Sequence, residues 1–130
     1  MSRELMTKDE IHVFGLQVLI QYLEGKGYEI EFAQPDAKNI PHIIAKSGEQ
    51  LTFILAATDI YPNKGKISDE DKAAVLEHAK SFNAQSACAY LGLANAEGVE
   101  KGDKELTGKA YKDARFMTDF SGLEFICFED

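Results

Sequence analysis

The chain has 130 residues, a formal net charge of −8 from 22 acidic and 14 basic residues, and fractions of 45% hydrophobic and 28% charged residues. This length suits one domain over residues 1–130 that buries roughly two-thirds of the surface of its unfolded chain, and the composition excludes wholesale disorder and fibrous repeats. The negative charge argues against a nucleic-acid partner, because nucleic-acid binding draws most of its affinity from cationic contacts to phosphate, although a local basic patch could still provide them.

The chain begins with a polar segment. MSRELMTKDE lacks the apolar core of a secretion signal, and the longest apolar stretches fall far short of the ~20 residues that span a bilayer. The two cysteines, Cys88 and Cys127, lie in apolar runs that predict strands, and we expect both to be reduced core thiols. A cytoplasmic protein without a membrane partner is expected.

The first predicted helix begins at a capping box. In Thr7-Lys8-Asp9-Glu10, the Thr7 hydroxyl and the Glu10 carboxylate each satisfy a free backbone donor at a helix start. Gly25 and Gly27 are stop signals. Between them, apolar side chains recur at helical spacing and form a face wide enough to lie against a sheet. These residues are Ile11, Phe14, Val18, Leu19, Tyr22 and Leu23.

Three predicted strands follow this helix. Residues 28–32 alternate between apolar and acidic side chains, which is the period of a strand with one wet face. After a loop around residues 35–41, HIIAK and LTFILAAT are β-rich runs joined by residues 47–50, Ser-Gly-Glu-Gln, which predict a hairpin turn. The second of these runs is apolar on both faces, so it should lie at the centre of the sheet.

A second helix and another buried strand come next. Residues 59–66 break the strand, and Ser68 is a predicted N-cap followed by three acidic residues that favour the positive end of a helix dipole. The helix should run to about Phe82, and Asn83 is its expected terminator. Its predicted apolar face consists of Val75, Leu76, Ala79 and Phe82. SACAYLGLA then predicts a strand buried on both faces, in which Gly92 permits a close approach.

The last part of the chain is expected to hold a loop and a strand pair. Residues 95–109 combine glycines and acidic residues with little periodicity, which predicts an exposed loop of about fifteen residues. ARFMTD and LEFICF are predicted strands of a hairpin around Ser121-Gly122. The element order is therefore helix, three strands, helix, strand and a final strand pair.

Three short patterns within this order resemble a known family. Gly15 is followed by Tyr22-Leu23 and Gly27-Tyr28, Pro41-His42-Ile43-Ile44-Ala45 has a proline before an apolar run, and residues 51–58 form the strand after the turn. These residues are similar to the first helix, the Pro-Asp-hydrophobic motif and the Glu-x-Lys strand of the PD-(D/E)xK superfamily, and especially of its Holliday-junction-resolvase-like members. The resemblance covers residues 15–93. It implies an α/β (α+β) restriction-endonuclease-like fold, with an αβββαβ core, a mixed central sheet flanked by helices, and extra C-terminal strands.

The resemblance also implies a catalytic site, and this chain lacks its residues. The family's chemistry needs carboxylate oxygens to hold a divalent cation that polarises phosphate and activates water, with a lysine that stabilises charge. Alignment places the helix glutamate at Leu16, the motif aspartate at His42, and the Glu-x-Lys pair at Leu55 and Ala57. Residues 53–58 contain neither carboxylate nor lysine, so the loss survives a slip of one or two residues. No catalytic residue, cofactor or metal is expected.

Two interpretations stay open. Either the domain is a catalytically retired relative, which we favour, or the fold assignment is wrong. An enzymatic alternative is a metal-dependent nuclease with migrated ligands from Glu24, His42 and Asp59 that binds Mg²⁺ or Mn²⁺. A strand-edge histidine is the simpler role of His42, and a turn is the simpler role of Asp59. A third alternative is a small-ligand site near the loop at residues 95–109.

The other polar residues are best explained as surface. His12 and His78 lie in predicted helices and are expected to be solvated or at a rim. The basic groups favour a solvated surface over a phosphate track. They are Lys64, Lys66, Lys109, Lys112 and Arg115. The leading hypothesis is thus a catalytically inactive endonuclease-like domain that acts through a protein partner or self-association, as a homodimer through an edge strand or a helix face.

Overall fold

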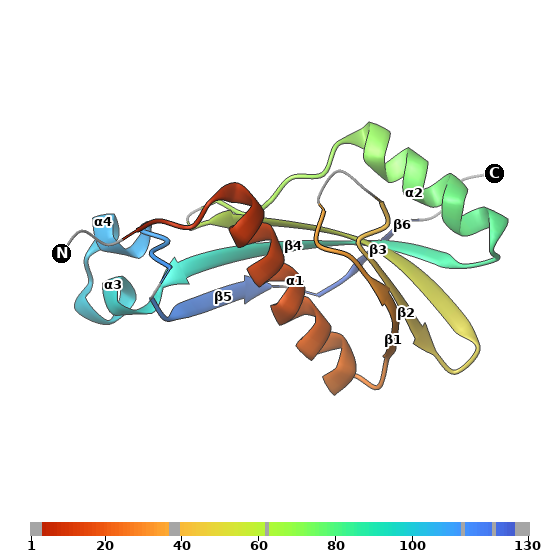
Figure 1. The fold of residues 1–130 in the computed structure, drawn as a ribbon, viewed down its shortest axis with the longest axis horizontal. Helices are drawn as coiled ribbons and strands as arrows, with labels where there is room; N and C mark the ends of the chain where they lie inside the picture. Colours follow the sequence, from red (N-terminus) through yellow and green to blue (C-terminus); the bar gives the residue numbers. More distant parts are fainter. Residues whose placement is uncertain (1–3, 37–39, 62, 113, 121, 127–130) are drawn as a thin grey trace.

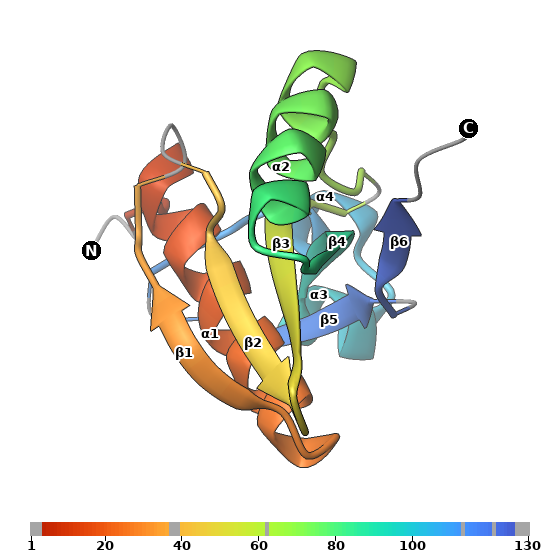
Figure 2. The same ribbon diagram turned by 90° about the vertical axis from the view of Figure 1, so that its right-hand side faces the viewer.

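The fold is a mixed six-stranded sheet with one long helix on each face (Figures 1 and 2). The computed structural model describes residues 4–36, 40–61, 63–112, 114–120 and 122–126. Its elements in chain order are α1 (Lys8–Gly25), β1 (Glu29–Ala33), β2 (Ile43–Ser47), β3 (Gln50–Ile60), α2 (Asp69–Ser81), β4 (Gln85–Asn95), α3 (Ala96–Lys101), α4 (Lys104–Thr107), β5 (Phe116–Phe120) and β6 (Glu124–Ile126).

The sheet order is β1-β2-β3-β4-β5, and β6 also pairs with β4. β2 is antiparallel to β1 and β3, β3 and β4 are parallel and joined through α2, and β5 and β6 are antiparallel to β4. This mixed sheet flanked by helices confirms the α/β (α+β) class expected from the sequence. The first six elements, helix, three strands, helix and strand, also follow the expected order.

Local signals set the helix starts as expected. Thr7 and Glu10 form the full capping box of α1, with the Glu10 N–H donating to Thr7 Oγ1 at 3.2 Å and the Thr7 N–H donating to Glu10 Oε1 at 3.0 Å. Ser68 caps α2 by accepting from the N–H of Asp71 at 3.1 Å. Asn83 follows α2 at φ 54°, a left-handed conformation that asparagine tolerates better than most residues.

The hairpin between β2 and β3 is tight. Ser47 pairs with Gln50, so the loop has two residues, and its first, Gly48, has φ 63°. A positive φ at this position costs little for glycine, and such turns match the twist of paired strands. The turn expected at residues 47–50 is therefore confirmed.

Alternation along β3 and β4 divides the core between the two faces. One face packs Ile54, Ala56, Ala87 and Ala89 against the α1 leucines, and the other packs Phe53, Leu55 and Cys88 against α2. Both strands are buried on both sides, as expected from their unbroken apolar runs. Cys88 is a free, buried thiol, and Cys127 lies outside the described residues.

Three details of the sequence interpretation are wrong. The buried stripe of α1 is made of His12, Gly15, Leu16, Leu19 and Leu23. His12, which was expected to be solvated or at a rim, is buried. Several apolar residues expected on the inner face of α1 are only partly buried, because α1 is rotated about its axis from the orientation that the apolar spacing predicts. Phe82, expected in the core, is 59% exposed at the end of α2.

The C-terminal part differs most from expectation. Residues 95–109 form α3 and α4 instead of a loop. β5 and β6 do not form a hairpin with each other, because they lie end to end along β4: β5 pairs with residues 91–95, and β6 with residues 86–88 (Figure 1). Within the described ranges, no helix is long and apolar enough to cross a membrane.

Candidate functional site

A cleft of about 340 Å³ opens beside the second half of β3. Its walls come from the first turns of α1, the residue before β2, the end of β3 and the segment that leads into α2. The lining residues are Lys8, Ile11, His12, His42, Leu55, Ala56, Ala57, Thr58, Asp59, Gly65, Lys66, Ile67 and Asp71. The cleft therefore gathers residues from four separate segments of the chain.

Four residues stand where the resemblance expects the family's catalytic residues, and three of them line this cleft. His42, Leu55 and Ala57 lie in its walls, whereas Leu16 is buried in the core between α1 and the sheet. The histidine one helical turn before Leu16, His12, lines the cleft in its place. Three of these four residues thus line one cleft, and α1 contributes Lys8, Ile11 and His12 to it instead of Leu16.

The alternative set of Glu24, His42 and Asp59 is only partly brought together. Asp59 and His42 line the same cleft. Glu24 is exposed near the end of α1, twelve residues after His12, which corresponds to about 18 Å along a helix. Because His12 contacts His42, Glu24 lies at the far end of the helix from the cleft.

His42 is anchored by the backbone of β3. It is 6% exposed, and its Nδ1 accepts a hydrogen bond of 2.9 Å from the Ala56 N–H. A neutral imidazole has one N–H and one lone pair, so acceptance at Nδ1 puts the proton on Nε2. A metal ion needs a free lone pair, and in this geometry His42 has already used it. His42 is therefore built to hold β3 in place, and would have to break this bond before binding a metal.

His12 lies against His42 in an edge-to-face arrangement, with ring centroids 4.7 Å apart. It is 7% exposed, and its Nε2 has no hydrogen-bond partner among the described residues. Burial lowers the pKa of His12, and the neighbouring His42 lowers it further, while Asp9 and Asp36 act in the opposite direction. Burial among these groups thus favours the neutral form of His12. The burial of His12 could have been predicted from the sequence, because His12, Leu16, Leu19 and Leu23 are spaced as one stripe on a helix.

We expect His12 to make folding stability fall in acid. Its pKa in the folded chain is lowered from the ordinary value of 6.5, so near and below that value the unfolded chain binds the extra proton more readily. The stabilisation is present above the unfolded-state pKa and is lost as the pH falls toward the folded-state pKa. Urea unfolding at about pH 7.5 and about pH 5.5 should show this loss, and His12→Phe should reduce it. An equal loss in His12→Phe would assign the effect to other groups.

The charged groups of the cleft are mixed and lie at its rim. Lys8 and Lys66 are balanced by Asp59 and Asp71, all of them exposed. Across the described part of the chain, no three His, Cys, Asp or Glu side chains are grouped so that they could hold a metal ion. Between these charged groups lie the imidazoles of His12 and His42 and the strand residues Leu55, Ala56, Ala57 and Thr58, of which only Thr58 is polar.

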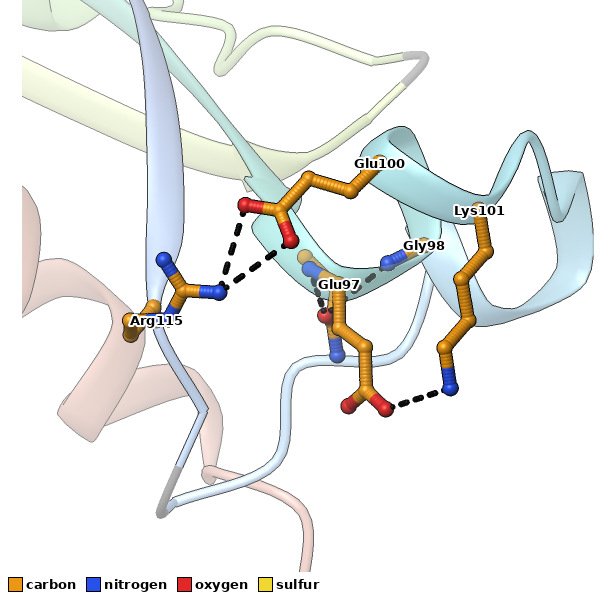
Figure 3. A network of polar contacts seen from close by, with 6 residues as sticks. Glu97, Gly98, Glu100, Lys101 and Arg115 are labelled. Carbon is orange, nitrogen blue, oxygen red and sulfur yellow. Dashed lines mark hydrogen bonds and ion pairs between the residues drawn. The ribbon is translucent and has the colours of Figure 1, made fainter.

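Several basic residues outside the cleft form ion pairs. Lys112 Nζ lies 3.3 Å from Glu4 and 3.5 Å from Glu10, and Arg115 lies 3.2 Å from Glu100 (Figure 3). These pairs leave no continuous cationic track along the series Lys109, Lys112 and Arg115. The observation agrees with the solvated surface expected from the sequence.

The segment that was expected to be a loop is a compact unit. Asn95 is 1% exposed, accepts from the N–H groups of Glu97 and Gly98, and donates to the Lys109 carbonyl at 2.9 Å. A side chain at Gly98 would collide with the backbone of Thr107, so α3 and α4 pack closely. The small-ligand alternative assumed a loop here, and that premise fails.

A second polar cluster lies on the face of the sheet that α2 covers. Lys72, Cys88 and Tyr90 line a small pocket with residues 124–126. Burial raises the pKa of the Cys88 thiol, so the thiol stays protonated at neutral pH and is a poor nucleophile. This cluster combines residues of α2 and β4, and the sequence analysis did not connect them.

The chain was compared with known proteins and with protein families. A search of curated proteins returned no match for this chain. Residues 9–126, which include every element from α1 to β6 apart from the first residue of α1, match the model of a family described as Domain of unknown function (DUF8840). Since this match covers most of the sequence, the chain belongs to that family.

Proposed function

We propose that this protein is a catalytically inactive relative of the PD-(D/E)xK nucleases that works in the cytoplasm through protein association. The supporting observation is the composition of the cleft beside β3. His42, Leu55 and Ala57, which stand where the resemblance requires an aspartate, a glutamate and a lysine, line one cleft together. A site that once held a cation would leave such a cluster after its ligands were replaced.

The replacement removes each chemical contribution that phosphodiester cleavage needs. Magnesium binds oxygen ligands, and the strand wall offers the alkyl groups of Leu55 and Ala57 in their place. The imidazole of His42 presents an N–H at Nε2, because its Nδ1 is committed to Ala56. Asp59 and Asp71 are the acids that line the cleft, and among the described residues they belong to no group of three His, Cys, Asp or Glu side chains that could hold a metal ion.

Protein association is favoured by the exposed edges of the sheet. Met117 on β5 is 52% exposed and Phe125 on β6 is 48% exposed, although both are large apolar residues. A net charge of −8 also works against binding to nucleic acid. A surface with these properties suits a protein partner better than a phosphate backbone.

A cleavage assay tests the proposal. Purified protein should leave supercoiled plasmid and labelled single-stranded and branched DNA or RNA uncut with either Mg²⁺ or Mn²⁺, and calorimetry should detect no binding of either ion. The matched variant is Asp59→Asn, which removes the one acid of the migrated set that lines the cleft. Cleavage that disappears in Asp59→Asn would overturn the proposal and establish a nuclease with relocated ligands.

A further inference from the structure

We propose that two copies of this chain associate through β5 and form one continuous antiparallel sheet across a twofold axis at Thr118. This inference rests on the proposed mode of action, association, and it names the partner and the surface. An edge strand presents a row of backbone N–H and C=O groups that another strand can pair with. Among the described residues, β5 is paired on one side only, with β4.

The two edges of the sheet differ in how well they resist such pairing. At the β1 edge, Glu29 and Glu31 are exposed, and the pairing with β2 is irregular between Ile30 and Phe32. Charges and bulges are the features by which proteins block an edge. A full-length pairing of β1 with a second copy would also place Glu31 opposite Glu31.

The β5 edge lacks these protections. Its one charge, Asp119, lies 3.5 Å from Lys64 of its own chain, and the central residues Met117, Thr118 and Asp119 are exposed. The strand pairs with β4 without a register shift. Since a free, regular and nearly uncharged edge pairs most readily, β5 is the edge at which a second strand would be added.

The sequence of β5 is complementary to itself. In an antiparallel sheet with twofold symmetry, residues that face each other must lie on the same face, so the axis passes through a residue. With the axis at Thr118, Phe116 faces Phe120 of the second copy, Met117 faces Asp119, and Thr118 faces itself. No like charges are opposed, and each copy contributes one aromatic residue to each of two Phe–Phe pairs.

The strand is already held in the shape that pairing requires. Phe116 packs edge-to-face on Phe14, and Phe120 on Tyr22, with ring centroids 5.3 Å and 4.8 Å apart. Both contacts are with α1, so the helix fixes both ends of β5. A prepared edge loses little conformational freedom on association, which favours binding.

Charge substitutions at Thr118 test this arrangement, because a residue on the axis faces its own copy. Light scattering after size exclusion, over protein concentrations from about 10 µM to about 1 mM, should show a dimer of the native chain. Thr118→Glu alone and Thr118→Lys alone should each raise the dimer dissociation constant by about tenfold or more, because like charges then meet. An equimolar mixture of the two variants should restore the dimer.

The controls separate this inference from the proposed loss of catalysis. Glu31→Lys changes the charge of the other edge and should leave the dimer intact, and circular dichroism should show that every variant is folded. A native chain that stays monomeric, or a dimer indifferent to both Thr118 substitutions, would overturn the inference. In either case, an absence of DNA and RNA cleavage would still support the inactive site.

Discussion

Gly15→Ala is expected to lower the free energy of unfolding by about 3 kcal/mol, because the added methyl group has no room. The new Cβ would fall inside the contact distance of Thr58 Oγ1 and 2.8 Å from Thr58 Cβ. Helix propensity alone would favour alanine over glycine by roughly 0.5–1 kcal/mol, so the steric term must win for the sign to be destabilising. Chemical denaturation of the native and variant chains measures the difference.

The same helix offers a matched control for this substitution. Gly25 ends α1, and a Cβ there would meet nothing within 4 Å. Gly25→Ala should therefore leave stability unchanged or raise it by about 0.5 kcal/mol. Adding Thr58→Ala to Gly15→Ala should recover part of the loss, since it removes the hydroxyl but keeps the nearby Cβ. Equal effects at Gly15 and Gly25 would contradict the close contact between α1 and β3.

His42→Ala is expected to lower the free energy of unfolding by about 3 kcal/mol, through two losses that add. The substitution leaves a cavity beside His12, and it leaves the buried N–H of Ala56 without the acceptor that His42 Nδ1 provides at 2.9 Å. A role for His42 in the structure, as opposed to a role as a metal ligand, predicts this loss in metal-free buffer. Thermal or urea unfolding in the presence of a chelator measures it.

His42→Asn is the control that distinguishes the two losses. The asparagine amide oxygen can accept from the Ala56 N–H in place of Nδ1, although it does not fill the space of the ring. His42→Asn should therefore be more stable than His42→Ala. If the native chain is stabilised by added Mg²⁺ or Mn²⁺ and His42→Asn is not, His42 is a metal ligand and the structural role assigned to it is wrong.

Much of the fold follows from local signals in the sequence. The helix starts depend on Thr7, Glu10 and Ser68, whose side chains bond to backbone groups three residues away, and the β2–β3 turn depends on Gly48, whose backbone conformation is its own property. Such interactions span a few residues, so a single sequence contains them in full. The two central strands were equally clear, because burial on both faces demands an unbroken apolar run.

The errors lie in helices too short to show a period and in strands whose partner is distant in sequence. Residues 95–109 look irregular because α3 and α4 are too short to show a helical period. Asn95 and Asp103 are the N-caps of these helices, but the glycines nearby made the segment resemble a loop. β5 and β6 were expected to pair with each other because they are neighbours in sequence. They pair instead with different parts of β4, since β4 is an 11-residue strand long enough to hold both end to end.

The sequence by itself determined that residues 53–58 carry no carboxylate and no lysine, because residue type does not depend on folding. Only the tertiary structure decided that His12, and not Leu16, lines the cleft, and that the Ala56 N–H donates to His42 Nδ1. Both facts depend on how α1 is rotated against the sheet and on the register of β2 with β3. Rotation and register are set by the packing of the whole core, which no local pattern specifies.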